Sequence, residues 1–99
     1  MVRRIVWSAV AIQERSEILK YWSVRNKSKV FSKKLYVLLI DAVERISVNP
    51  NIGHLTNRTS TRIKIVREYL IVYKIDTDKI KILSIIDGRR DPEEINKRF

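Results

Sequence analysis

Apolar and basic residues alternate along two stretches in the second half of the chain. The first reads Arg-Ile-Lys-Ile over residues 62–65, and the second reads Lys-Ile-Lys-Ile over residues 79–82. A period of two is typical of strands that bury one face and expose the other. The pattern therefore predicts a small sheet with an apolar back and a basic front, built from strands over residues 62–66, 69–75 and 79–86.

The rest of the chain predicts helices that cover the back of this sheet. Residues 3–7 are rich in β-branched and aromatic side chains and are predicted as a further strand. Ser8 is a suitable N-cap for a helix over about residues 9–23. A second helix is predicted over about residues 29–48, where apolar side chains recur every three or four positions. Asp-Pro-Glu-Glu at residues 91–94 predicts the start of a short C-terminal helix.

The connection between strands 62–66 and 69–75 decides which side chains share a face. A two-residue loop of Arg67 and Glu68 would require Gly, Asn or Asp at positive φ, so we expect a three-residue connection that pairs Val66 with Leu70. The isoleucines at 63, 65, 71, 75, 80 and 82, together with Tyr73, then face the back. The front holds basic residues (Arg62, Lys64, Lys74, Lys79, Lys81) and an apolar strip (Leu70, Val72, Leu83, Ile85).

Composition adds a strong positive charge to this picture. The 99 residues predict one domain, 1–99, and 21 Lys and Arg against 11 acidic residues give a net charge of +10. Such a chain favours an acidic partner, which could be nucleic acid, an acidic protein or an anionic surface. It has no cysteine, no signal-peptide h-region and no apolar run long enough to span a bilayer. We therefore expect a cytoplasmic protein without a membrane partner.

Few residues are arranged for catalysis. The sequence has no Gly-rich phosphate loop, no metal-ligand cluster and no cysteine nucleophile, so we expect neither a metal nor a cofactor. Basic side chains on a sheet can bind phosphates or stabilise the charge of a phosphodiester transition state. Composition does not separate these two roles from a merely solvated basic face. The candidates for binding a target or nucleic acid are Arg62, Lys64, Lys81, Arg89 and Arg90.

The order of elements resembles a known family. The chain runs strand, two helices, three strands. It carries Trp7-Ser8 before the first helix, a loop from Pro50 to Gly53, and the segments RIKIVREYLIVYKI and IIDGRRDP. In these features it resembles the RelE/ParE superfamily of bacterial toxins over nearly its whole length. The resemblance implies an α+β fold, with a four-stranded antiparallel sheet packed on an N-terminal helical hairpin (β-α-α-β-β-β). It also implies the toxin of a type II toxin–antitoxin system, neutralised by a small cognate antitoxin.

The resemblance leaves two targets open. RelE-like members cut mRNA in the ribosomal A site without a metal, whereas ParE-like members poison DNA gyrase. The basic positions of the nuclease pattern match Arg62, Lys64 and Arg89, or Arg90 in place of Arg89 if the register slips. The arginine that follows a tyrosine is here Leu70, and the C-terminal tyrosine falls near Ile95. The phosphate-binding residues are thus partly retained, and the proton-transfer groups are mostly lost.

Losing one positioned acid or base costs a reaction about 100- to 10,000-fold in rate. We therefore favour a ParE-like gyrase inhibitor that does not cut nucleic acid. One alternative is a RelE-like ribosome-dependent mRNA endonuclease, with Arg62, Lys64 and Arg89 as its catalytic residues. A second alternative is a non-toxic basic module that binds nucleic acid.

Surplus apolar residues point to the antitoxin. The front strip and the second helix expose more apolar surface than a lone domain usually does. An acidic amphipathic segment of a cognate antitoxin would cover this surface and offset the charge of +10. The predicted antitoxin-binding residues are Leu70, Val72, Leu83, Ile85, Tyr36, Val37 and Ile40.

Overall fold

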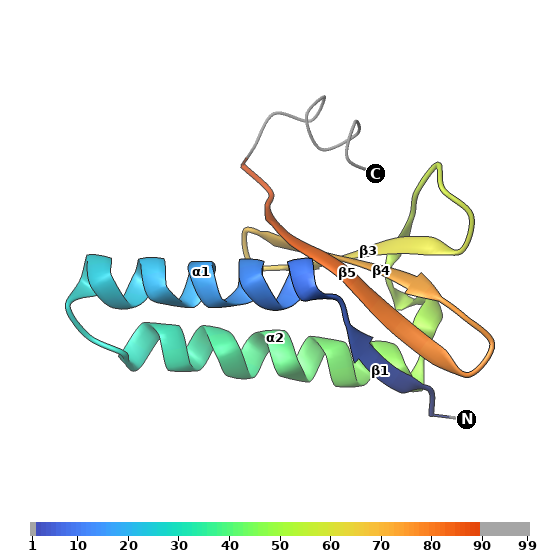
Figure 1. Ribbon diagram of the computed structural model, residues 1–99, viewed down its shortest axis with the longest axis horizontal. Helices are drawn as coiled ribbons and strands as arrows, with labels where there is room; N and C mark the ends of the chain where they lie inside the picture. Colours follow the sequence, from blue (N-terminus) through green and yellow to red (C-terminus); the bar gives the residue numbers. More distant parts are fainter. Residues whose placement is uncertain (1, 90–99) are drawn as a thin grey trace.

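Two long helices pack side by side against one face of a sheet in the computed structural model, which describes residues 2–89 (Figure 1). The α+β class and the helical hairpin are confirmed. The predicted C-terminal helix lies outside the described residues. The elements are, in order, β1 (Arg4–Trp7), α1 (Ala9–Asn26), α2 (Val30–Val48), the 3-10 helix η1 (Pro50–Ile52), β2 (His54–Leu55), β3 (Thr61–Val66), β4 (Tyr69–Ile75) and β5 (Lys79–Asp87).

The sheet has five strands in the order β1-β5-β4-β3-β2, so the prediction of a four-stranded antiparallel sheet is wrong on two counts. The additional strand, β2, has only two residues and pairs with Arg62 and Ile63 of β3. Two residues are too few to show any alternation in the sequence. In addition, β1 runs parallel to β5, because the helical hairpin and three strands intervene before the chain returns beside β1.

Local sequence signals explain where the helices begin and end. The Ser8 side chain accepts a hydrogen bond of 3.0 Å from the Ala11 N–H and caps α1. Lys27 adopts a left-handed conformation with φ 51° and ends this helix. Pro50 follows α2 and prevents its continuation. Residues spaced three, four or seven apart face the sheet from α2: Leu35, Leu39, Ala42, Val43 and Ile46.

The predicted register of the β3–β4 hairpin is also wrong. Val66 pairs with Tyr69, so the loop is the two-residue Arg67-Glu68 turn, and Arg67 takes a φ of 57°. The N–H of Gly88, beyond the end of β5, donates a 2.6 Å hydrogen bond to the Glu68 carbonyl and holds this turn. The sequence rule failed because a contact distant in the chain supports an arginine where glycine is usual.

This register reverses the faces of β3. The buried residues Tyr69, Ile71 and Tyr73 of β4 belong to the core under the helices. Lys64 lies opposite Ile71, and Arg62 opposite Tyr73, so both basic residues lie on the helix-facing side. The alternating isoleucines of β3 lie on the far side, and the prediction that they are buried under the helices is wrong. They are Ile63, half-buried, and Ile65, 52% exposed.

A β-bulge corrects the prediction for β5. Tyr73 pairs with Ile82, but its neighbour Val72 pairs with Ser84, so Leu83 is an extra residue. The bulge places Ile85 in the core, where it is 1% exposed, and not in the predicted front strip.

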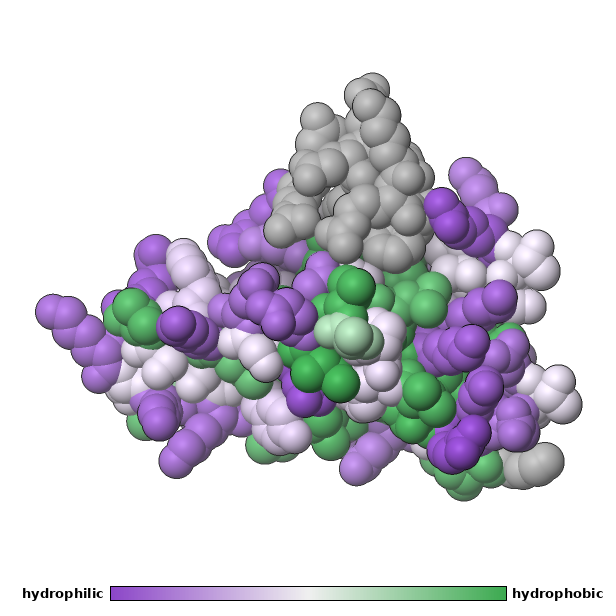
Figure 2. Space-filling view, viewed as in Figure 1, coloured by the Kyte–Doolittle hydropathy of each residue, from purple (hydrophilic) through white to green (hydrophobic). Residues whose placement is uncertain are grey.

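Figure 2 shows apolar residues where α1 and β1 meet the sheet, and hydrophilic residues around the β4–β5 turn. No helix within residues 2–89 combines the length and hydrophobicity needed to cross a bilayer.

Candidate functional site

Arg62 is occupied with holding a loop. Its guanidinium donates hydrogen bonds to the Gly53 carbonyl at 2.8 Å and to the Asn51 carbonyl at 3.3 Å. These carbonyls belong to the turn that leads from η1 into β2. Arg62 therefore connects β3 to this turn, and its donors are partly used within the protein.

Lys64 lies two residues further along the same side of β3. It lines an open cleft of about 560 Å³ between β3 and the C-terminal end of α2, together with the acidic residues Asp41 and Glu44 and the ion-paired Arg45. The cleft mixes both signs of charge. Lys64 therefore shares this cleft with two carboxylates and one further cation.

Lys81 lies on the opposite face of the sheet. It pairs across the strands with Lys74, and it alternates with the core residues Ile80 and Ile82. Its ammonium is 3.9 Å from the Asp76 carboxylate. The sheet therefore separates Lys81 from Arg62 and Lys64.

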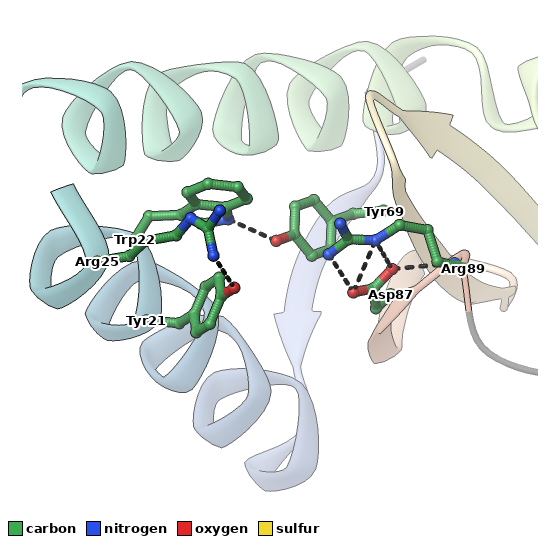
Figure 3. Close-up of polar contacts among 6 residues, drawn as sticks. All are labelled: Tyr21, Trp22, Arg25, Tyr69, Asp87 and Arg89. Atoms are coloured by element: carbon green, nitrogen blue, oxygen red, sulfur yellow. Dashed lines mark hydrogen bonds and ion pairs between the residues drawn. The ribbon is translucent and has the colours of Figure 1, made fainter.

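Arg89 is held by an acid at the end of β5. Its Nε and Nη2 donate to the Asp87 carboxylate at 2.9 and 2.7 Å, and its backbone N–H donates to the same carboxylate (Figure 3). These bonds and the charge of Asp87 raise the pKa of Arg89 above its ordinary value. Arg90, the fifth predicted basic residue, lies outside the described residues.

The structure therefore distributes the predicted basic residues over three places. Arg62 and Lys64 lie on the helix side of β3, Lys81 on the far face, and Arg89 beyond the end of β5. Val66 lies at the end of β3 that is near Arg89. Arg62 lies four positions before Val66, which corresponds to about 13 Å along the strand. Leu70, which replaces the arginine of the nuclease pattern, lies on the opposite face of the sheet from Lys64.

A cleft that the sequence did not predict lies between α1 and the end of β5. It has a volume of about 350 Å³ and is lined by Glu14, Glu17, Ile18, Tyr21, Tyr69, Ile85, Asp87 and Arg89. Figure 3 shows Tyr69 of β4 pointing towards Trp22 of α1, whose indole N–H donates a 2.6 Å bond to the tyrosine oxygen. The sequence signal that could have indicated this cleft is the aromatic pair at positions 21 and 22.

Tyr69 and Glu14, which line this cleft, are both hydrogen-bonded within the protein. Burial raises the pKa of Tyr69, and the Trp22 hydrogen bond only partly opposes this effect, so the phenol stays protonated near neutral pH. Glu14 accepts hydrogen bonds from the Ser84 hydroxyl and the Ile85 N–H. Within residues 2–89, no group of three or more His, Cys, Asp or Glu side chains is placed to hold a metal ion.

The predicted antitoxin-binding residues divide into exposed and buried sets. Tyr36 and Val37 of α2 are 42% and 64% exposed, and they line an apolar groove of about 420 Å³ with Leu19 of α1. Ile40, Leu70 and Leu83 are half-buried. Val72 and Ile85 are 0% and 1% exposed, so these two side chains do not offer a free surface.

A helical hairpin on one face of a mostly antiparallel sheet, with dispersed basic residues, is the architecture of a small toxin of the RelE/ParE superfamily. The family model described as "ParE toxin of type II toxin-antitoxin system, parDE" matches residues 5–92. The chain therefore belongs to the ParE toxin family and is a type II toxin, which implies a cognate antitoxin as its partner.

Solved structures agree with this fold. The chain is similar to a protein of the chromosomal ParDE toxin–antitoxin system from P. aeruginosa, with a TM-score of 0.75 and 14% identity over 87% of this chain and 96% of that one. It is also similar to the YoeB dimer from Staphylococcus aureus, with a TM-score of 0.59 and 20% identity over 85% of this chain and 94% of that one. No curated protein sequence matches the chain.

Proposed function

We propose that this toxin arrests growth by binding DNA gyrase and that it does not cut RNA. One observation carries the proposal: Lys64 and Leu70 of the nuclease pattern lie on opposite faces of the sheet. Membership of the ParE family supports the same conclusion.

Metal-independent cleavage of RNA requires an acid, a base and a cation within reach of one phosphate. Arg62 donates to the carbonyls of Asn51 and Gly53, and Arg89 forms a bidentate pair with Asp87. Recruiting either arginine to a phosphate would break bonds that the folded protein already makes. Binding a target protein, in contrast, does not require these groups to lie close together.

We propose further that an acidic segment of the antitoxin covers the apolar groove between the helices. Tyr36 and Val37 line this groove and, with the half-buried Ile40 further along α2, would supply the apolar contacts to the antitoxin. The net charge of +10 would attract acidic residues around them. Leu70 and Leu83, both half-buried, remain candidates on the sheet. Val72 and Ile85 are excluded from this surface by their burial.

The function is tested by measuring gyrase activity and mRNA integrity with the same variants. Purified wild-type protein is expected to inhibit DNA supercoiling by gyrase, and brief induction in cells is expected to stop growth while a reporter mRNA stays intact in primer extension. Lys64→Ala/Arg89→Ala removes two candidate catalytic cations without touching the Arg62 hydrogen bonds. Lys20→Ala/Lys33→Ala, on the helices, removes the same charge as a control.

Both double variants are expected to leave the mRNA intact. Cuts in register with the reading frame that appear with the wild type and the control, but disappear with Lys64→Ala/Arg89→Ala, would establish a ribosome-dependent nuclease and refute the proposal. Normal supercoiling with growth arrest and intact mRNA would refute gyrase as the target.

A further inference from the structure

Four cations lie together on the sheet face that is turned away from the helices. Arg4 of β1 pairs directly with Lys79 of β5, and Lys81 of β5 pairs directly with Lys74 of β4. The intervening residues Ile80 and Ile82 belong to the core under the helices, so the four cations share the other face. We call Arg4, Lys74, Lys79 and Lys81 the cationic face.

This arrangement is unfavourable for the isolated protein. Like charges directly opposite each other on neighbouring strands destabilise a sheet. The described residues place one carboxylate in ion-pair contact with the cationic face, that of Asp76, at 3.9 Å from the Lys81 ammonium. Arg4 and Lys74 are exposed, and Lys79 and Lys81 are partly exposed, so solvent and ligands reach all four. Two adjacent repulsive pairs with this single counter-ion indicate a surface whose charge is neutralised by an external polyanion.

We propose that the cationic face binds the phosphodiester backbone of duplex DNA. The proposal rests on the proposed function, because the target enzyme works on duplex DNA. Neighbouring strands are about 4.8 Å apart and alternate residues about 7 Å apart, so the cations form a closely spaced array on three strands. Lysine is depleted from the cores of protein–protein interfaces, whereas contacts with nucleic acid depend on it. Val6, paired with Lys81 and 36% exposed, is a large apolar side chain of β1 beside the array.

DNA binding is measured by fluorescence anisotropy with a labelled duplex of about 30 base pairs and the full-length chain at several salt concentrations, because the salt dependence reports phosphate contacts. The variant Arg4→Gln/Lys74→Gln/Lys79→Gln/Lys81→Gln removes the cationic face. Lys20→Gln/Lys29→Gln/Lys33→Gln/Lys34→Gln removes four exposed charges from the helical hairpin and is the matched control. Thermal unfolding of each variant shows that it is folded, and removal of repulsive pairs is not expected to lower the melting temperature.

The wild type is expected to lose affinity steeply with salt, and the cationic-face variant is expected to bind at least about tenfold more weakly at low salt. Its slope of log K against log salt should be smaller by about 3 to 4, since each phosphate contact contributes about 0.9. The control should stay within about twofold of the wild type. Equal losses in the two variants would show a general charge effect and overturn the proposal.

Two competitors distinguish other partners. Polyglutamate that displaces DNA at equal charge concentration would assign the face to an acidic protein, and tighter binding of an RNA duplex would assign it to RNA. Either result overturns the DNA proposal. A supercoiling assay separates this inference from the function. If the wild type does not inhibit gyrase, the proposed function fails whatever the DNA affinity. If the cationic-face variant loses DNA affinity but inhibits gyrase normally, the function stands and the role of this face in it is refuted.

Discussion

Replacing Gly53 by alanine is expected to disturb a fully buried polar contact. A Cβ atom at this position would lie 2.5 Å from the Tyr73 hydroxyl oxygen, 2.9 Å from Tyr73 Cε1 and 3.0 Å from the Ile63 carbonyl. The Tyr73 hydroxyl accepts a 3.0 Å hydrogen bond from the Gly53 N–H and donates one of 2.6 Å to the Pro50 carbonyl. Tyr73 is 0% exposed, so its ring has no free space to move into.

The cost follows from these contacts. Overpacking a closely packed site costs about 1–3 kcal/mol, and each buried hydrogen bond lost adds about 1 kcal/mol. The backbone of Gly53, at φ −80° and ψ 162°, suits alanine, and the smaller entropy of the unfolded chain returns about 0.4–1 kcal/mol. We expect Gly53→Ala to lower the free energy of unfolding by about 3 kcal/mol. For a domain of this size, that corresponds to a fall in melting temperature of roughly 12–24 °C.

Urea unfolding of the wild type, the two single variants, their double variant and one control tests the origin of this cost. Tyr73→Phe removes the oxygen that the new methyl group would strike, so Gly53→Ala should cost about 1 kcal/mol less in the Tyr73→Phe background than in the wild type. Asn51→Ala in the same loop, whose side chain is exposed, should stay within about 0.5 kcal/mol of the wild type. If Gly53→Ala unfolds like the wild type, or if the two substitutions are simply additive, the steric argument is refuted.

Two further predictions concern the region between α1 and the sheet. Glu14→Ala leaves the Ser84 hydroxyl and the Ile85 N–H without their acceptor. Glu14→Ala should lower the free energy of unfolding by about 1–3 kcal/mol and speed hydrogen exchange at the Ile85 N–H, and Glu14→Gln should have a smaller effect on both quantities. An unchanged exchange rate at Ile85 would contradict this prediction. Burial raises the pKa of Tyr69 above its ordinary value of 10.0, so at alkaline pH the unfolded chain releases a proton that the folded chain keeps. Stability should therefore fall as the pH rises above about 10, less steeply in Tyr69→Phe, whereas equal falls measured by urea unfolding would refute the role of Tyr69.

Local sequence signals determined most of the secondary structure. Ser8 and Pro50 fixed ends of the helices because capping and the missing proline N–H act within one turn. The spacing of apolar residues likewise predicted α2 and its core face from Leu35 to Ile46. These features depend on neighbours three or four residues away, which a single sequence displays directly.

The faces of the strands were decided by contacts distant in the chain. A strand changes its buried face when its register moves by one residue, and two such shifts occurred here. Arg67 adopted φ 57° within the turn that Gly88 holds by its hydrogen bond to Glu68, and the bulge at Leu83 turned Ile85 inward. Arg62 therefore lies on the helix side, where it bonds the η1–β2 turn.

The candidate sites followed the same division. The sequence determined that the chain is basic and of the RelE/ParE type, since charge and element order are properties of the chain itself. Only the tertiary structure separated Lys64 from Lys81 and placed Arg4, near the start of the chain, beside Lys79. The alternation with apolar residues predicted that Lys74, Lys79 and Lys81 share a face. Strand order and register depend on the packing of the whole sheet, so the local pattern could not show that Arg4 joins them while Arg62 and Lys64 lie on the other side.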